Sequence, residues 1–341
     1  MNKVTDDLYP VGKLPQQDLV AMLRHQSLKD PRVILGPGLG RDAAVINFGD
    51  RYLVAKTDPI TFATDQIGWY AAHVNANDVA CLGATPQWFI ATLLLPEGKT
   101  DRTLVEEIFD QIHTGCSEVG ASLVGGHTEI TYGLGRAIVV GAMFGEVAPE
   151  NLVRSDGAQP GDHLLLTKGI AVEGTALIAR EVPQRLREEV GSRVLSRASD
   201  FLRHPGISVV RDAAVMTSAG EVHAMHDPTE GGFATGLREM MEAAGVGAII
   251  KEQALPIFPE TEAFCKVLDL DPLGLIASGA LLAAVAPQDA EPIVAALEKE
   301  GIAAAIIGEV REKPGIVLQG PDGERAFPLF PRDEIARLFE E

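Results

Sequence analysis

Residues 67–83, IGWYAAHVNANDVACLG, place one carboxylate within an otherwise largely apolar helix. We expect Asp65 to cap this helix, which runs to about Leu82, and Gly83 to end it. Its inward face carries a stripe of apolar side chains: Ile67, Ala71, Val74 and Cys81. Asp78 lies on the same stripe, one helical turn from two of its members. A charge there is costly unless it is paired or bound to a metal ion, so Asp78 is the first candidate functional residue.

The segments on both sides of this helix read as a mixture of strands and helices. In the first half, the expected strands cover residues 43–47, 52–56, 88–95, 122–124 and 137–147, and the expected helices cover residues 14–28 and 104–119. In the second half, strands are expected at residues 163–167, 222–225, 280–285, 303–310 and 316–318, and helices at residues 173–180, 232–244 and 290–299. We predict an α/β fold with mixed (α+β) sheets.

A polar, turn-rich segment at residues 151–162 separates the two halves. The chain has 341 residues and a mass of 36.3 kDa, which is too large for one compact domain. We therefore predict an N-terminal domain of residues 1–155 and a C-terminal domain of residues 156–341.

The charge balance is strongly acidic, because 29 Lys and Arg residues face 48 Asp and Glu residues, for a net charge of −19. Such a composition argues against a nucleic-acid partner, since binding to that backbone relies on clustered Lys and Arg. An acidic composition is compatible with a nucleotide ligand, because a divalent cation held by carboxylates can bind the phosphates of the nucleotide.

The cysteines and the N-terminal residues indicate the cellular compartment of the protein. The three cysteines, Cys81, Cys116 and Cys265, are widely spaced and form no C-x-x-C pair, so neither a disulfide framework nor a zinc cluster is indicated. The first ten residues, MNKVTDDLYP, lack the apolar centre of a signal peptide, and no apolar run reaches the length of a membrane span. We expect a cytoplasmic protein with no membrane contact.

The common nucleotide-binding and hydrolase motifs are absent. The sequence contains no G-x-x-x-x-G-K-[ST], no H-E-x-x-H and no G-x-S-x-G. The stretch GPGLG, residues 36–40, is not G-x-G-x-x-G, and it leads into a strand rather than a helix. A P-loop enzyme, a dinucleotide fold, a zinc protease and a serine hydrolase are therefore not supported.

The first half offers instead a series of acidic residues at turn positions. Asp42 follows the glycine-rich loop, Asp58 follows the strand at residues 52–56, and GGHTE (125–129) follows the strand at residues 122–124. Carboxylates at strand ends can converge on one sheet edge and bind Mg²⁺, while a glycine loop lets backbone N–H groups approach phosphate. Taken singly, Asp42 and Asp58 also fit ordinary turn caps, and Asn77-Asp78 fits a satisfied polar pair.

Six segments, in their order along the chain, resemble the PurM-like superfamily of ATP-using enzymes. They are GPGLGRDAAVI (36–46), KTDPITF (56–62), NANDVACLGATP (75–86), LLLPEG (93–98), GGHTEIT (125–131) and HDPTEGG (226–232). The superfamily includes aminoimidazole ribonucleotide (AIR) synthetase, thiamine-monophosphate kinase, selenophosphate synthetase and the hydrogenase-maturation protein HypE. The last segment is similar to the DPTRGG motif of HypE, so the resemblance points to HypE and AIR synthase-related members and implies hydrogenase maturation.

This resemblance implies an architecture and a set of ligands. The N-terminal domain would pair its strands across a homodimer and bind Mg²⁺ and ATP in the dimer-lined cleft, with the C-terminal domain over that cleft. Asn77 would lie beside the metal, and Gly38 and Gly40 in a loop over the phosphates. Carried over by motif, the magnesium ligands are Asp42, Asp58 and Asp78.

The second glycine segment departs from the usual superfamily pattern. Many members have Asp or Glu after the glycine pair, where this chain has His127 after Gly125 and Gly126. Glu129 lies on the same side of an extended segment as His127 and is a candidate replacement ligand. Gly125 and Gly126 are candidate cofactor-binding residues and His127 is a candidate catalytic residue, although a plain hydrogen-bonding role also fits this histidine.

Four further residues are candidates by position. Lys56 and Lys168 lie at strand ends where each could meet phosphate, Lys56 being also a catalytic candidate; a solvated lysine is the alternative. His226 has the pKa range of a general acid or base, and a structural role is the alternative. Asp227 is expected to bind metal or to cap the helix that starts near Gly231.

Three functions remain open on these residues. The first is an ATP-dependent enzyme, ligase- or dehydratase-like or a phosphotransferase, that phosphorylates an oxygen of an amide-like or carboxamide substrate. The second is a small-molecule kinase resembling thiamine-monophosphate kinase, and the third is a nucleotide-binding partner protein without turnover. HypE carries its carboxamide on a terminal cysteine, whereas residues 333–341 contain none, so we expect a small-molecule or protein-borne substrate.

Overall fold

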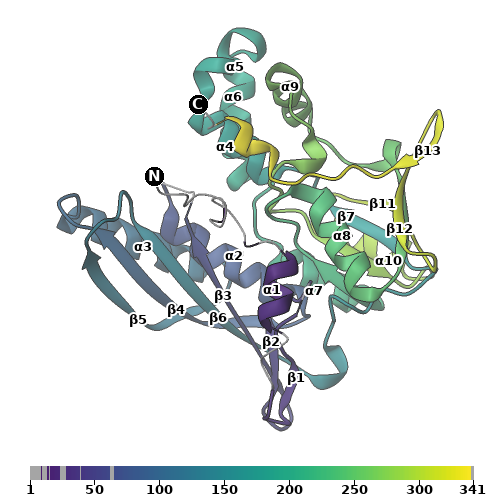
Figure 1. Ribbon diagram of the computed structural model, residues 1–341, viewed down its shortest axis with the longest axis horizontal. Helices are drawn as coiled ribbons and strands as arrows, with labels where there is room; N and C mark the ends of the chain where they lie inside the picture. The colour runs from purple at the N-terminus through teal and green to yellow at the C-terminus, as the bar shows by residue number, and fades with distance from the viewer. Residues whose placement is uncertain are drawn as a thin grey trace, which may run out of the picture.

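Two mixed sheets, one in each half of the chain, form the framework of the protein (Figure 1). The computed structural model describes residues 9, 14, 16–23, 28–38, 40–61 and 65–338. The first sheet has the strand order β1-β2-β3-β6-β4-β5, and the second has the order β13-β12-β9-β11-β7-β10-β8. Parallel pairs, β4 with β5 and β9 with β12, lie among antiparallel neighbours, so the predicted mixed α/β fold is confirmed.

The element bounds are as follows. The first sheet contains β1 (Val33–Leu35), β2 (Ala44–Asn47), β3 (Tyr52–Ile60), β4 (Thr85–Pro96), β5 (Ser122–Thr131) and β6 (Ile138–Val147). The second contains β7 (His163–Thr167), β8 (Val222–His226), β9 (Gly247–Lys251), β10 (Leu282–Val285), β11 (Ala304–Arg311), β12 (Gly315–Gly320) and β13 (Gly323–Ala326). The α-helices are α1 (Gln16–Leu23), α2 (Ile67–Cys81), α3 (Arg102–Glu118), α4 (Val172–Glu181), α5 (Pro183–Val190), α6 (Ser192–Ser199), α7 (Val210–Ala219), α8 (Gly232–Ala244), α9 (Pro259–Leu268) and α10 (Ala290–Lys299).

One apolar core runs from the first half of the chain into the second. α2 and α3 pack on one face of the first sheet, and the same cluster of buried side chains continues into α7 through Ala213 and Met216. α8 belongs to a separate cluster on the other face of the second sheet, around Phe233 and Leu237. The shared core fixes α2 at the junction of the two halves (Figure 1).

β3 is longer than the sequence pattern predicts. The expected turn at Asp58-Pro59 is wrong, because β3 continues to Ile60 and pairs with β6 along its whole length. Proline is tolerated there because β2 pairs with β3 only as far as Ala55, so β3 has one neighbour beyond that point among the described residues. Asp58 therefore lies within a strand rather than after it.

β5 is also longer than predicted, and its glycine pair is part of the strand. The expected end of this strand at residue 124 is wrong, since β5 continues to Thr131 alongside β4. The register shifts between Phe89 and Ile90 of β4, which is the signature of a bulge in the strand opposite. A Cβ atom on Gly126 would lie 2.0 Å from the carbonyl oxygen of Ala91, so close strand approach explains this glycine.

The start of α2 differs from the prediction as well. Gln66, with a left-handed φ of 55°, precedes the helix without a side-chain cap, while Asp65 forms an ion pair with Arg180 of α4. The predicted helix at residues 14–28 is described only as α1, because residues 15 and 24–27 lie outside the described part of the chain. The domain boundary at residues 155 and 156 stays a prediction. No helix within the described ranges is long and apolar enough to cross a membrane.

Candidate functional site

Four segments bring acidic and basic side chains together where the two halves meet. Lys56 and Asp58 share the face of β3 that packs against α2, because alternate residues of a strand point the same way. The side-chain amide of Asn75 on α2 donates to the carbonyl oxygen of Asp58 at 3.3 Å, which holds this helix against β3. Asp78 follows one turn later on α2, so it faces the same space.

The ammonium group of Lys56 lies among four aspartates. Its Nζ is 3.2 Å from Oδ2 of Asp78 and 3.6 Å from Oδ2 of Asp58. Burial alone would lower the pKa of Lys56, but the charges of Asp78, Asp58, Asp42 and Asp227 together raise it well above its usual value. A positive charge is therefore held where the carboxylates converge.

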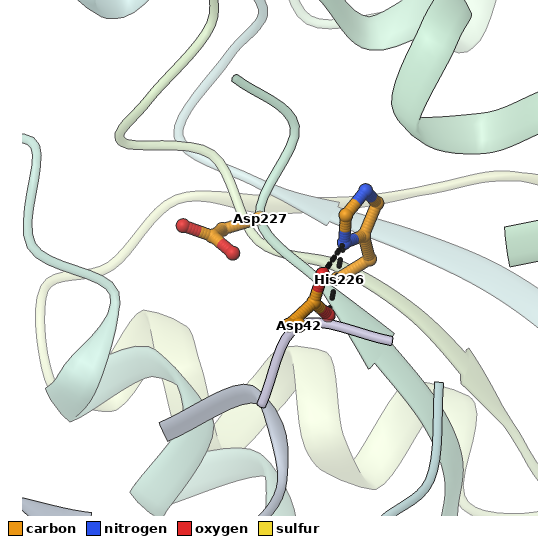
Figure 2. Close-up of side chains that lie close together, drawn as sticks. All are labelled: Asp42, His226 and Asp227. Carbon is orange, nitrogen blue, oxygen red and sulfur yellow. Dashed lines mark hydrogen bonds and ion pairs between the residues drawn. The ribbon is translucent and has the colours of Figure 1, made fainter. Parts of the chain in front are cut away.

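Asp42, His226 and Asp227 form the second part of this site (Figure 2). They come from the segment before β2 and from the end of β8, and their potential ligand atoms lie within 4.8 Å of one another. His226 Nδ1 is 3.1 Å from Oδ2 of Asp42, and its Nε2 is 3.3 Å from Oε2 of Glu239 on α8. Burial opposes charging of His226, yet the charge of Asp42 and the hydrogen bonds with Asp42 and Glu239 raise its pKa well above the usual range.

Asp227 and Asp78 are deeply buried carboxylates. Burial, followed by the charge of Asp42, raises the pKa of Asp227 to about 6. Burial likewise raises the pKa of Asp78 well above its ordinary value. Asp227 Oδ1 accepts a hydrogen bond from the Cys81 thiol at 3.5 Å, while its Oδ2 has no hydrogen-bond partner in the described ranges. An unpartnered buried carboxylate oxygen favours a cation as its missing partner.

The charge balance of the cluster fits a hard divalent cation. Among the described residues of this cluster, five carboxylates, Glu239 included, face the two basic side chains Lys56 and His226, which leaves negative charge that burial makes costly. Mg²⁺ takes oxygen ligands from a small number of carboxylates together with phosphate and water. Of the oxygen donors, those of Asp42 and Asp227 lie in one group close enough to share an ion, together with His226, whereas Asp58 and Asp78 each lie beside Lys56.

The glycine-rich loop lies next to this cluster. Gly40 has a left-handed φ of 62°, and a Cβ atom there would lie 3.0 Å from the carbonyl oxygen of Glu239, the partner of His226. A Cβ atom on Gly38 would meet the side chain of Arg41 at 2.9 Å. The loop is therefore packed against α8 beside the acidic cluster, and its contact with phosphate stays a prediction.

Asn77 and Lys168 instead hold the chain segment that leads into α7. Asn77 Nδ2 donates to the carbonyl oxygen of Ile207 at 2.8 Å, and its Oδ1 accepts from the amide of Val209 at 2.9 Å. Lys168 Nζ donates to the carbonyl oxygen of Ser208 at 2.6 Å and lies 3.1 Å from Oδ1 of Asp212. Burial lowers the pKa of Lys168 despite that partner. Both side chains are engaged here, so neither lies free to reach phosphate in this arrangement.

The residues predicted from the second glycine segment lie on the far edge of the first sheet. Gly126 is opposite Ala91, Ala91 is opposite Gly141, and Gly141 is opposite Asp58, so β5 and β3 are separated by three strand spacings, or about 14 Å. The exposed His127 and Glu129 pair with each other, with Nε2 and Oε2 3.3 Å apart. Within one chain, Gly125, Gly126, His127 and Glu129 do not meet the acidic cluster.

Sequence reasoning missed Glu239. It lies on the face of α8 that also carries Gly236, where a Cβ atom would come within 3.1 Å of the His226 ring. Because residues three apart on a helix share a face, the small residue at 236 followed by an acid at 239 was the available signal. The apolar stripe of α2 predicts a core position for Cys81, and its thiol is buried, although it also contacts Asp227.

Known proteins similar to this chain agree with the architecture. Two family models match it: the AIR synthase related protein N-terminal domain over residues 40–147 and the C-terminal domain over residues 159–320. A carbamoyl dehydratase HypE of Rhizobium leguminosarum bv. viciae is 32% identical over 282 residues, which cover 80% of this chain and 77% of that protein. A putative hydrogenase expression/formation protein of Methanocaldococcus jannaschii is 28% identical over 343 residues, covering 97% and 98%.

Solved structures share the fold. A crystal structure of hydrogenase maturation protein HypE in complex with ATP has a TM-score of 0.72 at 24% identity and covers 96% of this chain and 98% of its own. Thiamine monophosphate kinase from Aquifex aeolicus has a TM-score of 0.68 at 20% identity, covering 92% and 97%.

Two mixed sheets that share one buried acidic cluster define a two-domain α/β protein whose site is built from both halves of the chain. More specifically, the chain belongs to the AIR synthase-related, PurM-like family and has HypE proteins among its relatives, which confirms the predicted resemblance.

Proposed function

We propose that this protein is an ATP-dependent enzyme of the HypE type, which uses Mg²⁺ and ATP to phosphorylate an oxygen of a carboxamide-like acceptor. The observation that carries the proposal is the Lys56 ammonium held among Asp42, Asp58, Asp78 and Asp227. Similarity to a carbamoyl dehydratase HypE and to an ATP-bound HypE structure supports the same reaction class.

The acidic cluster fits magnesium by its oxygen donors, its excess negative charge and the unpartnered Oδ2 of Asp227. When bound by Asp42, Asp58, Asp78 and Asp227, the ion would neutralise phosphate charge. Lys56 would then be released from Asp78 to contact the triphosphate, while His226 keeps the Asp42 carboxylate in place. Positioning and charge neutralisation supply most of the rate of phosphoryl transfer, so these residues need no covalent role.

We propose that none of the three cysteines in this sequence carries the acceptor. Cys81, Cys116 and Cys265 are all buried, and burial raises the pKa of each thiol. A buried, protonated thiol is a poor nucleophile and a poor carrier of a substrate group. We therefore propose a small-molecule acceptor or one carried by another protein.

A homodimer through the first sheet is part of this proposal. From Ser122 to Ile130 every residue of β5 is exposed, although β5 is a ten-residue strand at the edge of its sheet. Exposed apolar side chains gather on β5 and its neighbour β4: Trp88, Ile90, Leu123, Val124 and Ile130. A long apolar edge strand exposes unpaired backbone groups that tend to pair with another strand, and a second copy of the chain has a matching strand to pair with it. Such pairing would present His127 and Glu129 to the second copy.

Calorimetric titration with Mg²⁺ and ATP tests the nucleotide site. We expect Asp78→Asn and Asp227→Asn to weaken binding at least tenfold, whereas the exposed Asp110→Asn on α3 binds like the parent. Absence of Mg-ATP binding by the parent, or unchanged binding by Asp78→Asn, would refute the proposal.

Product analysis separates the remaining alternatives. ADP and phosphate formed together with an altered amide support the proposed reaction. A stable phosphorylated metabolite identifies a small-molecule kinase instead, and tight nucleotide binding without turnover identifies a non-catalytic partner protein.

A further inference from the structure

The helical pair of α5 and α6 stands at the outer end of the second half, at the top of Figure 1. Three side chains of the pair, Leu186, Leu195 and Ala198, are buried in an apolar cluster with residues of α4 and α9. Between these buried positions the two helices expose polar and charged residues. One side of the pair is therefore packed against the protein, and the other side faces solvent.

Arginine is concentrated in this part of the chain. Residues 180–203 contain six arginines and four acidic residues, for a net charge of +2, although the whole chain carries −19. Three of these arginines pair with acidic side chains. The other three are exposed and form no hydrogen bond or ion pair with another described residue: Arg185, Arg187 and Arg193. The solvent-facing side of α5 and α6 is therefore a local region of positive charge on an acidic protein.

An open hollow of about 620 Å³ lies along α6. It is lined by Arg193, Ser196, Arg197, Ser199 and Asp200. Two of these residues are already engaged, because the Ser199 hydroxyl donates to the carbonyl oxygen of Leu195 at 2.9 Å and Asp200 Oδ2 lies 2.9 Å from Nδ1 of His204. The groups left to bind a ligand are two guanidinium groups and the hydroxyl of Ser196, and all three can donate hydrogen bonds.

Arg197 is anchored at the hollow by a buried carboxylate. Its Nε lies 3.1 Å from Oε1 of Glu260 on α9, and the Glu260 side chain is 5% exposed whereas the Arg197 side chain is 69% exposed. The terminal nitrogens Nη1 and Nη2 of Arg197 form no hydrogen bond with a described residue. A guanidinium group fixed in this way presents free donors to solvent, so little side-chain freedom is lost when an anion binds.

Arg193 and Arg197 form a like-charge pair. Residues four apart on a helix lie on the same face, and two positive charges there repel each other. Both side chains line the same hollow, and Arg193 has no acidic partner in the described ranges that would offset the repulsion. A carboxylate between them would remove the repulsion and accept hydrogen bonds from both guanidinium groups. The pair therefore fits an anionic ligand.

The shape of the hollow indicates what carries this anion. Sites for free small molecules bury most of the ligand surface, whereas side chains along one exposed helix leave a ligand open to solvent. The anionic group therefore belongs to a larger molecule that contacts the helical pair from outside. A nucleic acid is disfavoured, because its binding relies on many basic contacts and this chain is strongly acidic. A protein segment with a few carboxylates needs only a small positive region.

We propose that Arg193, Ser196 and Arg197 on α6 form a docking site for an acidic segment of a partner protein. The negative charge elsewhere on the chain repels such a segment, so the segment is directed to the positive region on α5 and α6. This inference goes beyond the proposed function and does not depend on it, because the residues that line the hollow are not those of the acidic cluster.

Fluorescence anisotropy with a rhodamine-labelled peptide of ten glutamates tests the docking site, and a matched peptide of ten glutamines is the uncharged probe. We expect the parent to bind only the glutamate peptide. Arg193→Glu and Ser196→Glu should each weaken that binding at least tenfold, because each adds negative charge to the hollow. Neither side chain has a partner in the described ranges, so both variants should fold like the parent. Arg51→Glu is the matched control, since Arg51 is exposed between β2 and β3.

The expected pattern is binding of the glutamate peptide that is retained in Arg51→Glu, lost in the two α6 variants and weakened at least tenfold by about 0.5 M salt. Three results overturn the docking site: no binding of the glutamate peptide by the parent, equal binding of the two peptides, or equal effects of the three substitutions. Tighter binding of an oligothymidine of the same length than of the glutamate peptide also overturns it, because the face would then serve a nucleic acid.

Discussion

Asn77 and Val209 join the two halves of the molecule, because the side-chain oxygen of Asn77 accepts the main-chain N–H of Val209 at 2.9 Å. The amide nitrogen of the same side chain donates to the carbonyl oxygen of Ile207. A single buried side chain on α2 therefore satisfies two backbone groups next to α7. The acidic cluster depends on this arrangement, since Asp78 is the next residue on α2 and Asp227 belongs to the other half.

Asn77→Ala leaves both backbone groups unsatisfied in a buried environment. We expect it to lower the free energy of unfolding by about 2–4 kcal/mol, because each buried orphan group costs about 1–3 kcal/mol. Chemical denaturation measures the effect, and the exposed Asn151→Ala serves as the control. A loss below about 1 kcal/mol would contradict the role assigned to Asn77.

The glycine pair of β5 offers a matched comparison. Alanine at Gly126 would place its Cβ 2.0 Å from the carbonyl oxygen of Ala91, whereas a Cβ on Gly125 meets nothing within 4 Å. We expect Gly126→Ala to destabilise the protein by more than about 2 kcal/mol, and Gly125→Ala by less than about 1 kcal/mol. Thermal unfolding of the two variants checks the difference. Equal effects would show that the close approach of β4 to β5 does not require glycine at position 126.

The proposed homodimer predicts a specific change in molecular mass. Val124→Lys combined with Ile130→Lys places two charges on the exposed β5 edge, so we expect a dimer in the parent and a monomer in the variant. Sedimentation velocity measures both species. Thr103→Lys on the exposed surface of α3 is the control, and it should remain dimeric. A monomeric parent would remove the dimer from the proposal.

Glu173 makes stability depend on pH in a defined direction. Its pKa rises from 4.5 to about 7, with burial as the first cause, so the folded state binds a proton more tightly than the unfolded state. Stability is therefore lost as the pH rises from 4.5 to about 7, by up to about 3 kcal/mol. We expect Glu173→Gln to be more stable than the parent at pH 8 and equal to it below pH 4.5. Denaturation at the two pH values checks this, and a pH-independent difference would contradict it.

His73 acts in the opposite direction. Burial is the main cause that lowers its pKa from 6.5 to about 4, against the raising effect of Glu118, whose Oε2 lies 2.8 Å from its Nε2. The unfolded state then binds more protons between these values, so stability falls as the pH drops from 6.5 towards 4. His73→Gln should flatten this slope by about one proton. Denaturation across that pH range measures the slope, and an unchanged slope would assign it to other groups.

The local periodicity of the sequence predicts much of the site. The parts that it does not predict depend on contacts between residues far apart in the chain. Asp78 was found because helix geometry alone places it on the stripe of Val74 and Cys81. The dipeptide Asp58-Pro59 predicts a turn, because its place in a strand depends on where β2 ends, and only the sheet reveals that point. The sequence pattern ends the strand before GGHTE for a similar reason, since the partner strand β4 lies some thirty residues away in sequence. Glu239 reaches His226 only through the packing of α8 on β8.

The four aspartates differ in how far they lie from solvent, and this gives the cluster an inside and an outside. The Asp58 side chain is 40% exposed, whereas the Asp78 side chain is 8% exposed, and Lys56 lies between them. A nucleotide arriving from solvent would meet Asp58 before Asp78. The apolar core shared by α2 and α7 resists a wide separation of the two halves. We therefore expect the nucleotide to enter along the β3 side, without a large movement of one domain away from the other.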